Sequence, residues 1–241
     1  MKIAAAVIPA RYQSTRFPGK PLASILGKPM IQRVYEGVRQ AKLIDRIIIA
    51  TDDQRILRAA EEFGAEATMT SSEHHSGTER AAEVAQALKN RLVINVQGDE
   101  PLVTGEMVDQ LVEELQNGAT TMASLMAKVY DLSLIHEAHI VKVVADKEGY
   151  ALYFSRTPLP YQASEFFYQH IGIYGYQREF LLRFARMRPA RLELQEKLEQ
   201  LRALENGYKI KMIEILSPTL SVDTPQDIIR VEEFMKKKKY D

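Results

Sequence analysis

The residues best suited to chemistry lie in the stretch VIPARYQSTRFPGKPL, residues 7–22. Arg11, Arg16 and Lys20 supply positive charge there, and the prolines and Gly19 favour a loop. A loop of this kind after a buried strand can hold phosphate, because backbone N–H groups face the anion while arginine and lysine neutralise its charge. The same composition also suits a solvated surface loop whose prolines form turns. Spacing alone leaves both interpretations open.

Two standard phosphate-binding signatures are absent from this stretch. A Walker A loop needs a glycine five residues before its Gly-Lys pair and a serine or threonine after it. Around Gly19-Lys20 these positions hold Ser14 and Pro21. The dinucleotide fingerprint G-x-G-x-x-G is also missing. We therefore expect neither a P-loop ATPase nor a nicotinamide-dependent oxidoreductase.

The first half of the chain alternates strand-like and helical segments that would position such a loop. Short β-branched runs predict strands at 2–8, 46–51, 66–69 and 92–96. Apolar residues at helical spacing predict helices between and after them, near 31–38, 53–63, 78–90 and 107–115. Repeated β-α-β units imply an α/β fold with a doubly wound, mostly parallel, Rossmann-like sheet. Ligands of such folds bind beyond the carboxyl ends of the strands.

The second half has a different pattern. Four strand-like segments follow one another between about residues 119 and 176 without helical segments between them. Helices are then predicted at 177–186, 192–205 and 225–238, with a strand at 209–215. We expect a single domain of residues 1–241, in which 1–118 and 177–241 form the α/β core and about 119–176 form a β-rich lobe.

Composition narrows the class of protein. The chain has 241 residues, with 32 Lys and Arg against 32 Asp and Glu, so its formal net charge is zero. Charge balance argues against a general nucleic-acid or membrane-surface protein. The chain has no cysteine, which excludes disulfides, thiolate catalysis and cysteine-ligated zinc. Its apolar runs are too short for membrane insertion, so we expect a soluble, cytoplasmic protein.

Several sequence blocks resemble those of a known enzyme family. IPARYQSTRFPGKPL is similar to the N-terminal signature of the sugar-activating nucleotidyltransferases, specifically the cytidylyltransferases. HHSGTERAAEV, VINVQGDEPL, YALYFSR, HIGIYGY, LEQLR and SVDTPQD resemble the blocks of those members that act on the sugar acid Kdo (3-deoxy-manno-octulosonate). These blocks follow the family's order from residue 7 to residue 227, so the resemblance covers nearly the whole chain. It implies the nucleotide-diphospho-sugar transferase fold.

The resemblance implies a reaction in which CMP passes from CTP to the anomeric hydroxyl of Kdo, giving CMP-Kdo and pyrophosphate for lipopolysaccharide biosynthesis. Arg11 and Lys20 would hold the CTP triphosphate, assisted by Ser14 and Arg16. Ala10 and Arg80 would lie near the base. Arg80 has a simpler interpretation, an exposed cation in the first turn of a helix, where it would be slightly unfavourable.

The resemblance also implies Mg²⁺ held by Asp99 and Asp223, which we place with Arg11 and Lys20 in the catalytic set. Hard carboxylate oxygens suit Mg²⁺, which takes few protein ligands. Each aspartate has a structural alternative. Asp99 could cap a turn before Pro101, and Asp223 could cap the terminal helix.

The sugar acid would contact six residues by resemblance: Gln97, Arg156, His170, Tyr174, Glu199 and Gln200. For Glu199 and Gln200 a solvated helix surface is the alternative. Two segments near the sugar contacts depart from the family's pattern: RPARLELQEK (188–197) and the short segment 161–169. A homodimer is typical of the family, and residues 150–176 are a plausible contact. The competing functions are an N-acylneuraminate cytidylyltransferase and a non-catalytic nucleotide sensor.

Overall fold

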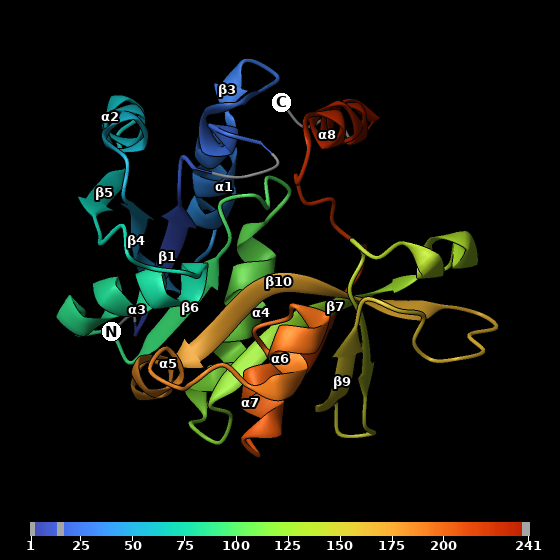
Figure 1. The fold of residues 1–241 in the computed structure, drawn as a ribbon. Helices are drawn as coiled ribbons and strands as arrows, with labels where there is room; N and C mark the ends of the chain where they lie inside the picture. Colours follow the sequence, from blue (N-terminus) through green and yellow to red (C-terminus); the bar gives the residue numbers. More distant parts are fainter. Residues whose placement is uncertain (1–2, 14–16, 238–241) are drawn as a thin grey trace. The chain divides into compact units, whose positions relative to one another are not determined.

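The computed structural model describes residues 3–13 and 17–237 (Figure 1). Contacts between residues divide the chain into two compact units. The first contains 1–109 and 219–241, and the second contains 110–218. The predicted lobe at about 119–176 lies wholly within the second unit, and its role as a separate lobe stays a prediction. None of the helices in the described part of the chain is long and apolar enough to cross a bilayer.

The first unit is built on four parallel strands. Their order is β6 (Leu92–Val96), β1 (Ala4–Ala10), β4 (Ile44–Thr51) and β5 (Glu66–Met69). β1 is buried along its whole length because it pairs with a strand on each side, which explains its continuous apolar sequence. The four strand predictions and the parallel α/β fold class are confirmed. The carboxyl ends of these strands meet at one edge of the sheet.

Three helices connect these strands: α1 (Met30–Arg39), α2 (Gln54–Glu62) and α3 (Gly77–Ala87). Side chains cap the first turns of two of them. Asp53 accepts a hydrogen bond from Arg55 N at the start of α2, and Ser76 accepts one from Glu79 N at the start of α3. Because each helix follows the carboxyl end of a strand, the capped ends lie at the same edge of the sheet as the loops.

A small structure that the sequence did not predict begins at Lys20, at the end of the basic segment, residues 7–22. The 3₁₀ helix η1 (Lys20–Leu22) leads into the hairpin β2 (Ser24–Ile25) and β3 (Lys28–Pro29). Ile25 of this hairpin packs in one apolar cluster with Val231 and Met235 of the terminal helix α8 (Pro225–Lys237). The basic segment is thereby anchored to the end of the chain.

The second unit is mostly antiparallel. β10 (Phe167–Gln177) pairs antiparallel with β7 (Met122–Val129) and with β8 (Lys142–Ala145), and β8 pairs antiparallel with β9 (Ala151–Ser155). β11 (Lys211–Ile215) adds to β7 in parallel. The short helices η2 (Leu132–His136) and α5 (Arg178–Phe184) complete this part, while α4 (Gly105–Gln116) begins in the first unit and ends in the second.

The prediction of one helix over 192–205 is wrong. Two short helices occupy this stretch, α6 (Arg191–Glu196) and α7 (Leu201–Glu205). Lys197 between them has φ 55°, a left-handed conformation that ends α6. Leu194 is consequently 65% exposed while Leu201 is fully buried, so the leucines of the predicted stripe do not share one buried face.

Candidate active site

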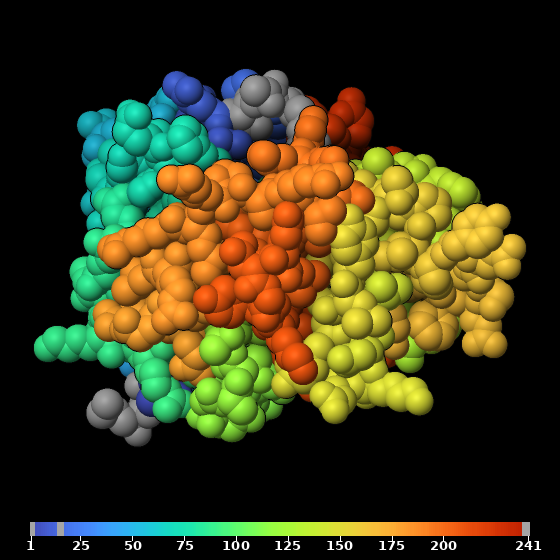
Figure 2. Space-filling view, turned by 60° about the horizontal axis from the view of Figure 1, so that its bottom comes forward, coloured from blue at the N-terminus to red at the C-terminus, as the bar shows by residue number. Residues whose placement is uncertain are grey.

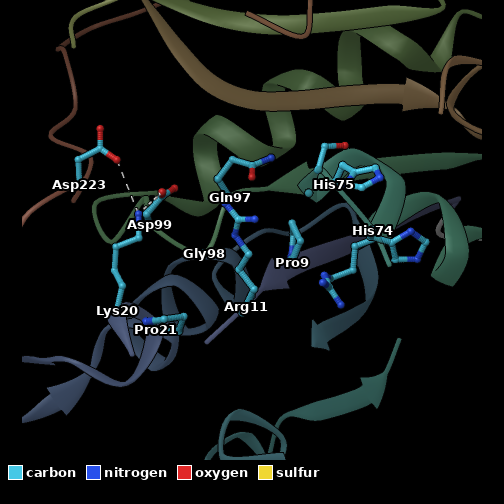
Figure 3. Close-up of a pocket in the computed structure, with 14 residues that line it drawn as sticks. Pro9, Arg11, Lys20, Pro21, His74, His75, Gln97, Gly98, Asp99 and Asp223 are labelled. Atoms are coloured by element: carbon cyan, nitrogen blue, oxygen red, sulfur yellow. Dashed lines mark hydrogen bonds and ion pairs between the residues drawn. The ribbon is translucent and has the colours of Figure 1, made fainter. Parts of the chain in front are cut away.

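A pocket of about 260 Å³ opens in the first unit at the carboxyl ends of β1 and β6 (Figure 3). Its walls come from the end of β1, the basic segment, the start of α3, the loop after β6 and the segment before α8. The lining residues are Pro9, Ala10, Arg11, Lys20, Pro21, His74, His75, Ser76, Gly77, Arg80, Gln97, Gly98, Asp99 and Asp223. All the residues predicted to contact the nucleotide or metal are therefore together here, except Ser14 and Arg16, which lie outside the described residues.

The two predicted metal-binding aspartates meet at Lys20. Its Nζ lies 2.6 Å from Asp99 Oδ2 and 3.8 Å from Asp223 Oδ1, and it donates to Val222 O at 2.8 Å (Figure 3). The main chain supports the same arrangement, because Val222 N donates to Asp99 O at 2.9 Å. Two carboxylates and one ammonium group thus converge although their positions in the sequence are far apart.

Asp227, in the first turn of the terminal helix α8, holds the backbone just before the helix. Asp227 Oδ2 accepts hydrogen bonds from Asp223 N at 3.1 Å and from Thr224 N at 2.8 Å. Burial alone would raise the pKa of Asp227, but these bonds, the Thr224 hydroxyl and the charge of Arg230 outweigh it and lower the pKa. The Asp223 carboxylate instead faces Lys20.

Glu100, next to Asp99, is an acidic residue that sequence reasoning missed. Its side chain is 6% exposed, and Thr219 Oγ1 donates to its Oε2 at 3.4 Å. Burial and the neighbouring charge of Asp99 raise the pKa of Glu100 to about 8. Glu100 is therefore mainly neutral at pH 7 and adds little negative charge behind the pocket. In the sequence, the signal for Glu100 was its position directly after Asp99 in GDEP, residues 98–101.

The basic segment is closed on itself around Tyr12. Gly19 N donates to Tyr12 O at 2.9 Å, and Gly19 has φ +73°. A Cβ at Gly19 would lie 3.1 Å from the Tyr12 ring, so both the backbone conformation and the ring favour glycine. The Arg55 guanidinium stacks on the same ring at 3.2 Å from its centroid. Arg11 and Lys20, on either side of Tyr12 in the chain, both line the pocket (Figure 3).

Arg80 is buried, so its interpretation as an exposed cation is wrong. Its side chain is 3% exposed. Its guanidinium donates to Asp52 Oδ2 at 2.7 Å, to Ser71 O at 3.2 Å and to the Thr70 hydroxyl. Asp52 follows β4 directly, a position at which the carboxyl-end rule could have identified it. These contacts fix Arg80 in the wall of the pocket.

Gln97 also has a constrained side chain. Its Nε2 donates to Oδ1 of the buried Asn95 at 3.3 Å. Gly77 leaves room on the other side, because a Cβ there would come within 2.7 Å of Gln97 Oε1. Asn95 and Gly77 therefore determine how Gln97 enters the pocket.

The pair His74 and His75 lines the pocket without forming a metal-binding cluster. His74 Nε2 contacts the Glu83 carboxylate, and its Nδ1 lies 3.9 Å from Glu79 Oε2. No group of three or more His, Cys, Asp or Glu side chains within residues 3–13 and 17–237 is arranged to hold a metal by itself. The carboxylates at Lys20 suit only a cation that takes its other ligands from substrate or water.

The other predicted sugar contacts belong to the second unit. The His170 and Tyr174 rings are 5.4 Å apart, and burial lowers the pKa of His170 to about 3, so its imidazole is neutral. Gln200 is 4% exposed, and Glu199 Oε1 lies 3.6 Å from Arg202 Nη2. The solvated-surface alternative is therefore wrong for Gln200. Arg156 donates to two backbone carbonyls at the corner between α6 and α7, Glu196 O and Lys197 O, and to Ala138 O just after η2.

Comparison with known proteins agrees with this geometry. The family model described as Cytidylyltransferase matches residues 5–211. A 3-deoxy-manno-octulosonate cytidylyltransferase of Geobacter sulfurreducens is 47% identical over 246 residues, covering 96% of this chain and 98% of the relative. One of Geotalea uraniireducens is 48% identical over 252 residues, covering 98% of this chain and all of the relative (100%).

Solved structures extend the comparison. The structure of CMP:2-keto-3-deoxy-manno-octonic acid synthetase complexed with CTP superposes with a TM-score of 0.91 at 39% identity, covering 98% of this chain and 99% of the other. The 4-diphosphocytidyl-2C-methyl-D-erythritol synthase of Anaerococcus prevotii has a TM-score of 0.64 at 17% identity over 98% of this chain and 99% of its own, a likeness of fold alone. This chain belongs to the cytidylyltransferase family, in the branch of the 3-deoxy-manno-octulosonate cytidylyltransferases.

Proposed function

We propose that this chain transfers CMP from CTP to the anomeric hydroxyl of Kdo and releases pyrophosphate. The observation that carries the proposal is the meeting of Lys20, Asp99 and Asp223 in one pocket. The chain that forms this pocket matches Kdo cytidylyltransferases over nearly its full length. These matches favour Kdo over N-acylneuraminate as the acceptor, and favour an enzyme over a nucleotide sensor.

The reaction needs positioning and charge neutralisation more than a protein nucleophile. The anomeric oxygen of Kdo attacks the α-phosphorus, and its proton passes to water. The bond from the α-phosphorus to the bridging oxygen breaks, and pyrophosphate leaves with the electron pair. Arg11 and Lys20 line the pocket, where they would offset the negative charge that develops on the leaving group.

The carboxylates fit the predicted Mg²⁺. Asp99 and Asp223 point at one cationic group, Lys20 Nζ, and each side chain is 32% exposed, so both can reach an ion in the pocket. When bound, Mg²⁺ would polarise the α-phosphate. Asp99 and Asp223 would hold it, while Lys20 would keep one ammonium group close to the same phosphates.

The remaining predicted roles follow from the same proposal. The proposed contacts of the Kdo carboxylate and hydroxyls, which rest on the family resemblance, are Gln97, Arg156, His170, Tyr174, Glu199 and Gln200. His170 is neutral and buried, so it would act as a hydrogen-bonding group and not as a charge. We further propose that the enzyme acts in the cytoplasm in lipopolysaccharide biosynthesis as a homodimer, with residues 150–176 in the contact.

Pyrophosphate release tests the proposal. The enzyme would receive CTP and Mg²⁺ with either Kdo or N-acetylneuraminate. We expect release with Kdo alone, and a loss of roughly 100-fold or more in Asp99→Ala. Asp45→Ala is a matched control, because Asp45 accepts a hydrogen bond from Asn90 at 2.8 Å and is not among the residues that line the pocket. Release with N-acetylneuraminate, or none with either acid, would reject the proposed acceptor.

A further inference from the structure

Lys142 on β8 is a lysine with no exposed surface. Its Nζ donates to three main-chain carbonyls, Glu137 O at 3.1 Å, Ile140 O at 2.7 Å and Arg156 O at 2.6 Å. These bonds use all three donors of an ammonium group. Burial and the charge of Arg156 lower the pKa of Lys142. A buried charge is costly unless it is fully hydrogen-bonded, and here the backbone supplies every acceptor.

Glu196 holds the other side of the same peptide segment. Its Oε2 accepts from Arg156 N at 3.0 Å, and its Oε1 accepts from Ser155 Oγ at 3.0 Å and from Tyr153 OH at 3.4 Å. The main chain of Arg156 is therefore held at its N–H by Glu196 and at its C=O by Lys142. Both contacts are made by charged groups, which form the stronger hydrogen bonds.

The Arg156 side chain extends this arrangement to the corner between α6 and α7. Its guanidinium donates to Glu196 O at 3.0 Å, Ala138 O at 3.0 Å and Lys197 O at 3.3 Å. Three of its five N–H groups are thus engaged, which leaves two for a ligand. In Figure 2 the orange atoms, which include α6 and α7, lie beside the yellow atoms of the segments near residue 150.

We propose that Lys142 and Glu196 are positioning residues of the sugar-acid site. They fix the backbone of Arg156 and, through its guanidinium, the corner that carries Glu199 and Gln200. The inference rests on the proposed function, because these three residues are its predicted Kdo contacts. An apolar side chain could fill the space of Lys142, but only a group with three donors sets the direction of three carbonyls at once.

Lys142→Met tests this role with little change of shape. Pyrophosphate release would be measured with CTP varied and with Kdo varied, and Kdo binding without CTP by calorimetry. We expect the KM for Kdo and its Kd to rise about tenfold or more, with the KM for CTP within roughly twofold of wild type. Lys128→Met is the matched control. Lys128 lies on β7 of the same unit and pairs with Glu214 at 2.9 Å, away from Arg156.

Glu196 supplies an independent test if Lys142→Met does not fold, as judged by circular dichroism. Glu196→Ala removes the acceptors of Arg156 N and Ser155 Oγ and should weaken Kdo binding as Lys142→Met does. Glu196→Gln keeps one acceptor oxygen and should recover much of the affinity. Kdo binding unchanged in the folded variants, or equal increases in both KM values, would overturn the inference. A wild-type enzyme without Kdo-dependent release would instead overturn the proposed function.

Discussion

Replacing His170 by glutamine should make the protein less sensitive to acid. His170 is 8% exposed. The centroid of its ring lies 4.9 Å from the centroid of the Phe154 ring, and its Nε2 lies 2.9 Å from Ser124 Oγ. The Ser124 hydroxyl also lies 2.9 Å from Ile173 O, an acceptor only, so the hydroxyl donates there and accepts from the imidazole. Burial is the cause of the shift that lowers the pKa of His170 to about 3, and no acidic side chain of residues 3–13 and 17–237 offsets it.

The size of the effect follows from proton linkage. In the unfolded chain His170 has its ordinary pKa of 6.5. Between that value and about 3, the unfolded state binds a proton that the folded state does not. This part of the stability is therefore fully present above about pH 6.5 and is lost as the pH falls. At pH 5.0, about 1.5 units below the ordinary pKa, the loss is ~2 kcal/mol, at 1.36 kcal/mol per unit.

Urea unfolding near pH 7.5 and near pH 5.0 measures this loss. The fall in the free energy of unfolding between the two pH values should be ~2 kcal/mol larger for wild type than for His170→Gln. His139→Gln, which changes an exposed histidine of the same unit, should behave as wild type does. Comparing each protein with itself removes any difference in stability at neutral pH. Equal falls in wild type and His170→Gln would refute the buried, neutral state of the imidazole.

Three further substitutions test the pocket and the core of the first unit. Lys20→Met should lower the rate of pyrophosphate release by roughly 100-fold or more, because Asp99 and Asp223 lose their common cation, whereas the surface variant Lys28→Met should retain the wild-type rate. Gly77→Ala should raise the KM for Kdo, because the added Cβ would displace Gln97. It should not lower the melting temperature, because alanine favours the helix more than glycine does. An unchanged KM would contradict a role of Gln97 in Kdo binding. Gly37→Ala should destabilise the protein by about 2 kcal/mol or more in urea unfolding, because its Cβ would lie 2.1 Å from Val103 O, and a stability equal to that of wild type would contradict this packing.

The strands and helices of the first unit could be predicted because their patterns are simple. A strand buried on both faces, such as β1, has a continuous apolar sequence, and α1 and α2 have apolar residues at helical spacing. The break at Lys197 had no comparable signal. Glycine, the usual residue in a left-handed conformation, is absent from this stretch, and Glu196 and Lys197 are good helix formers. The conformation there is set by tertiary hydrogen bonds, among them Arg156 to Lys197 O.

The burial of Arg80 shows the same limit for the site. The first turn of a helix is an unfavourable place for a cation, and helical position alone predicts an exposed side chain. Asp52 and Thr70 reverse this expectation, since they lie 28 and 10 positions away in the sequence and reach Arg80 only when β4 and β5 are side by side. Position at the end of a strand identifies such residues as candidates, but only the folded structure pairs them.

The charges of the pocket show why a chain with no net charge can hold a triphosphate. Arg11 and Lys20 face the pocket together with Asp99 and Asp223, so these four side chains balance one another. A charged Glu100 behind them would tip this balance towards repulsion of an anion. Burial and Asp99 prevent that by raising the pKa of Glu100 to about 8. Binding a divalent cation to the two aspartates would then give the pocket a positive balance in the place where CTP brings its negative charge. If the proposed Mg²⁺ binds to Asp99 and Asp223, the aspartates would prepare the pocket for metal and nucleotide together, and each would bind there more weakly alone.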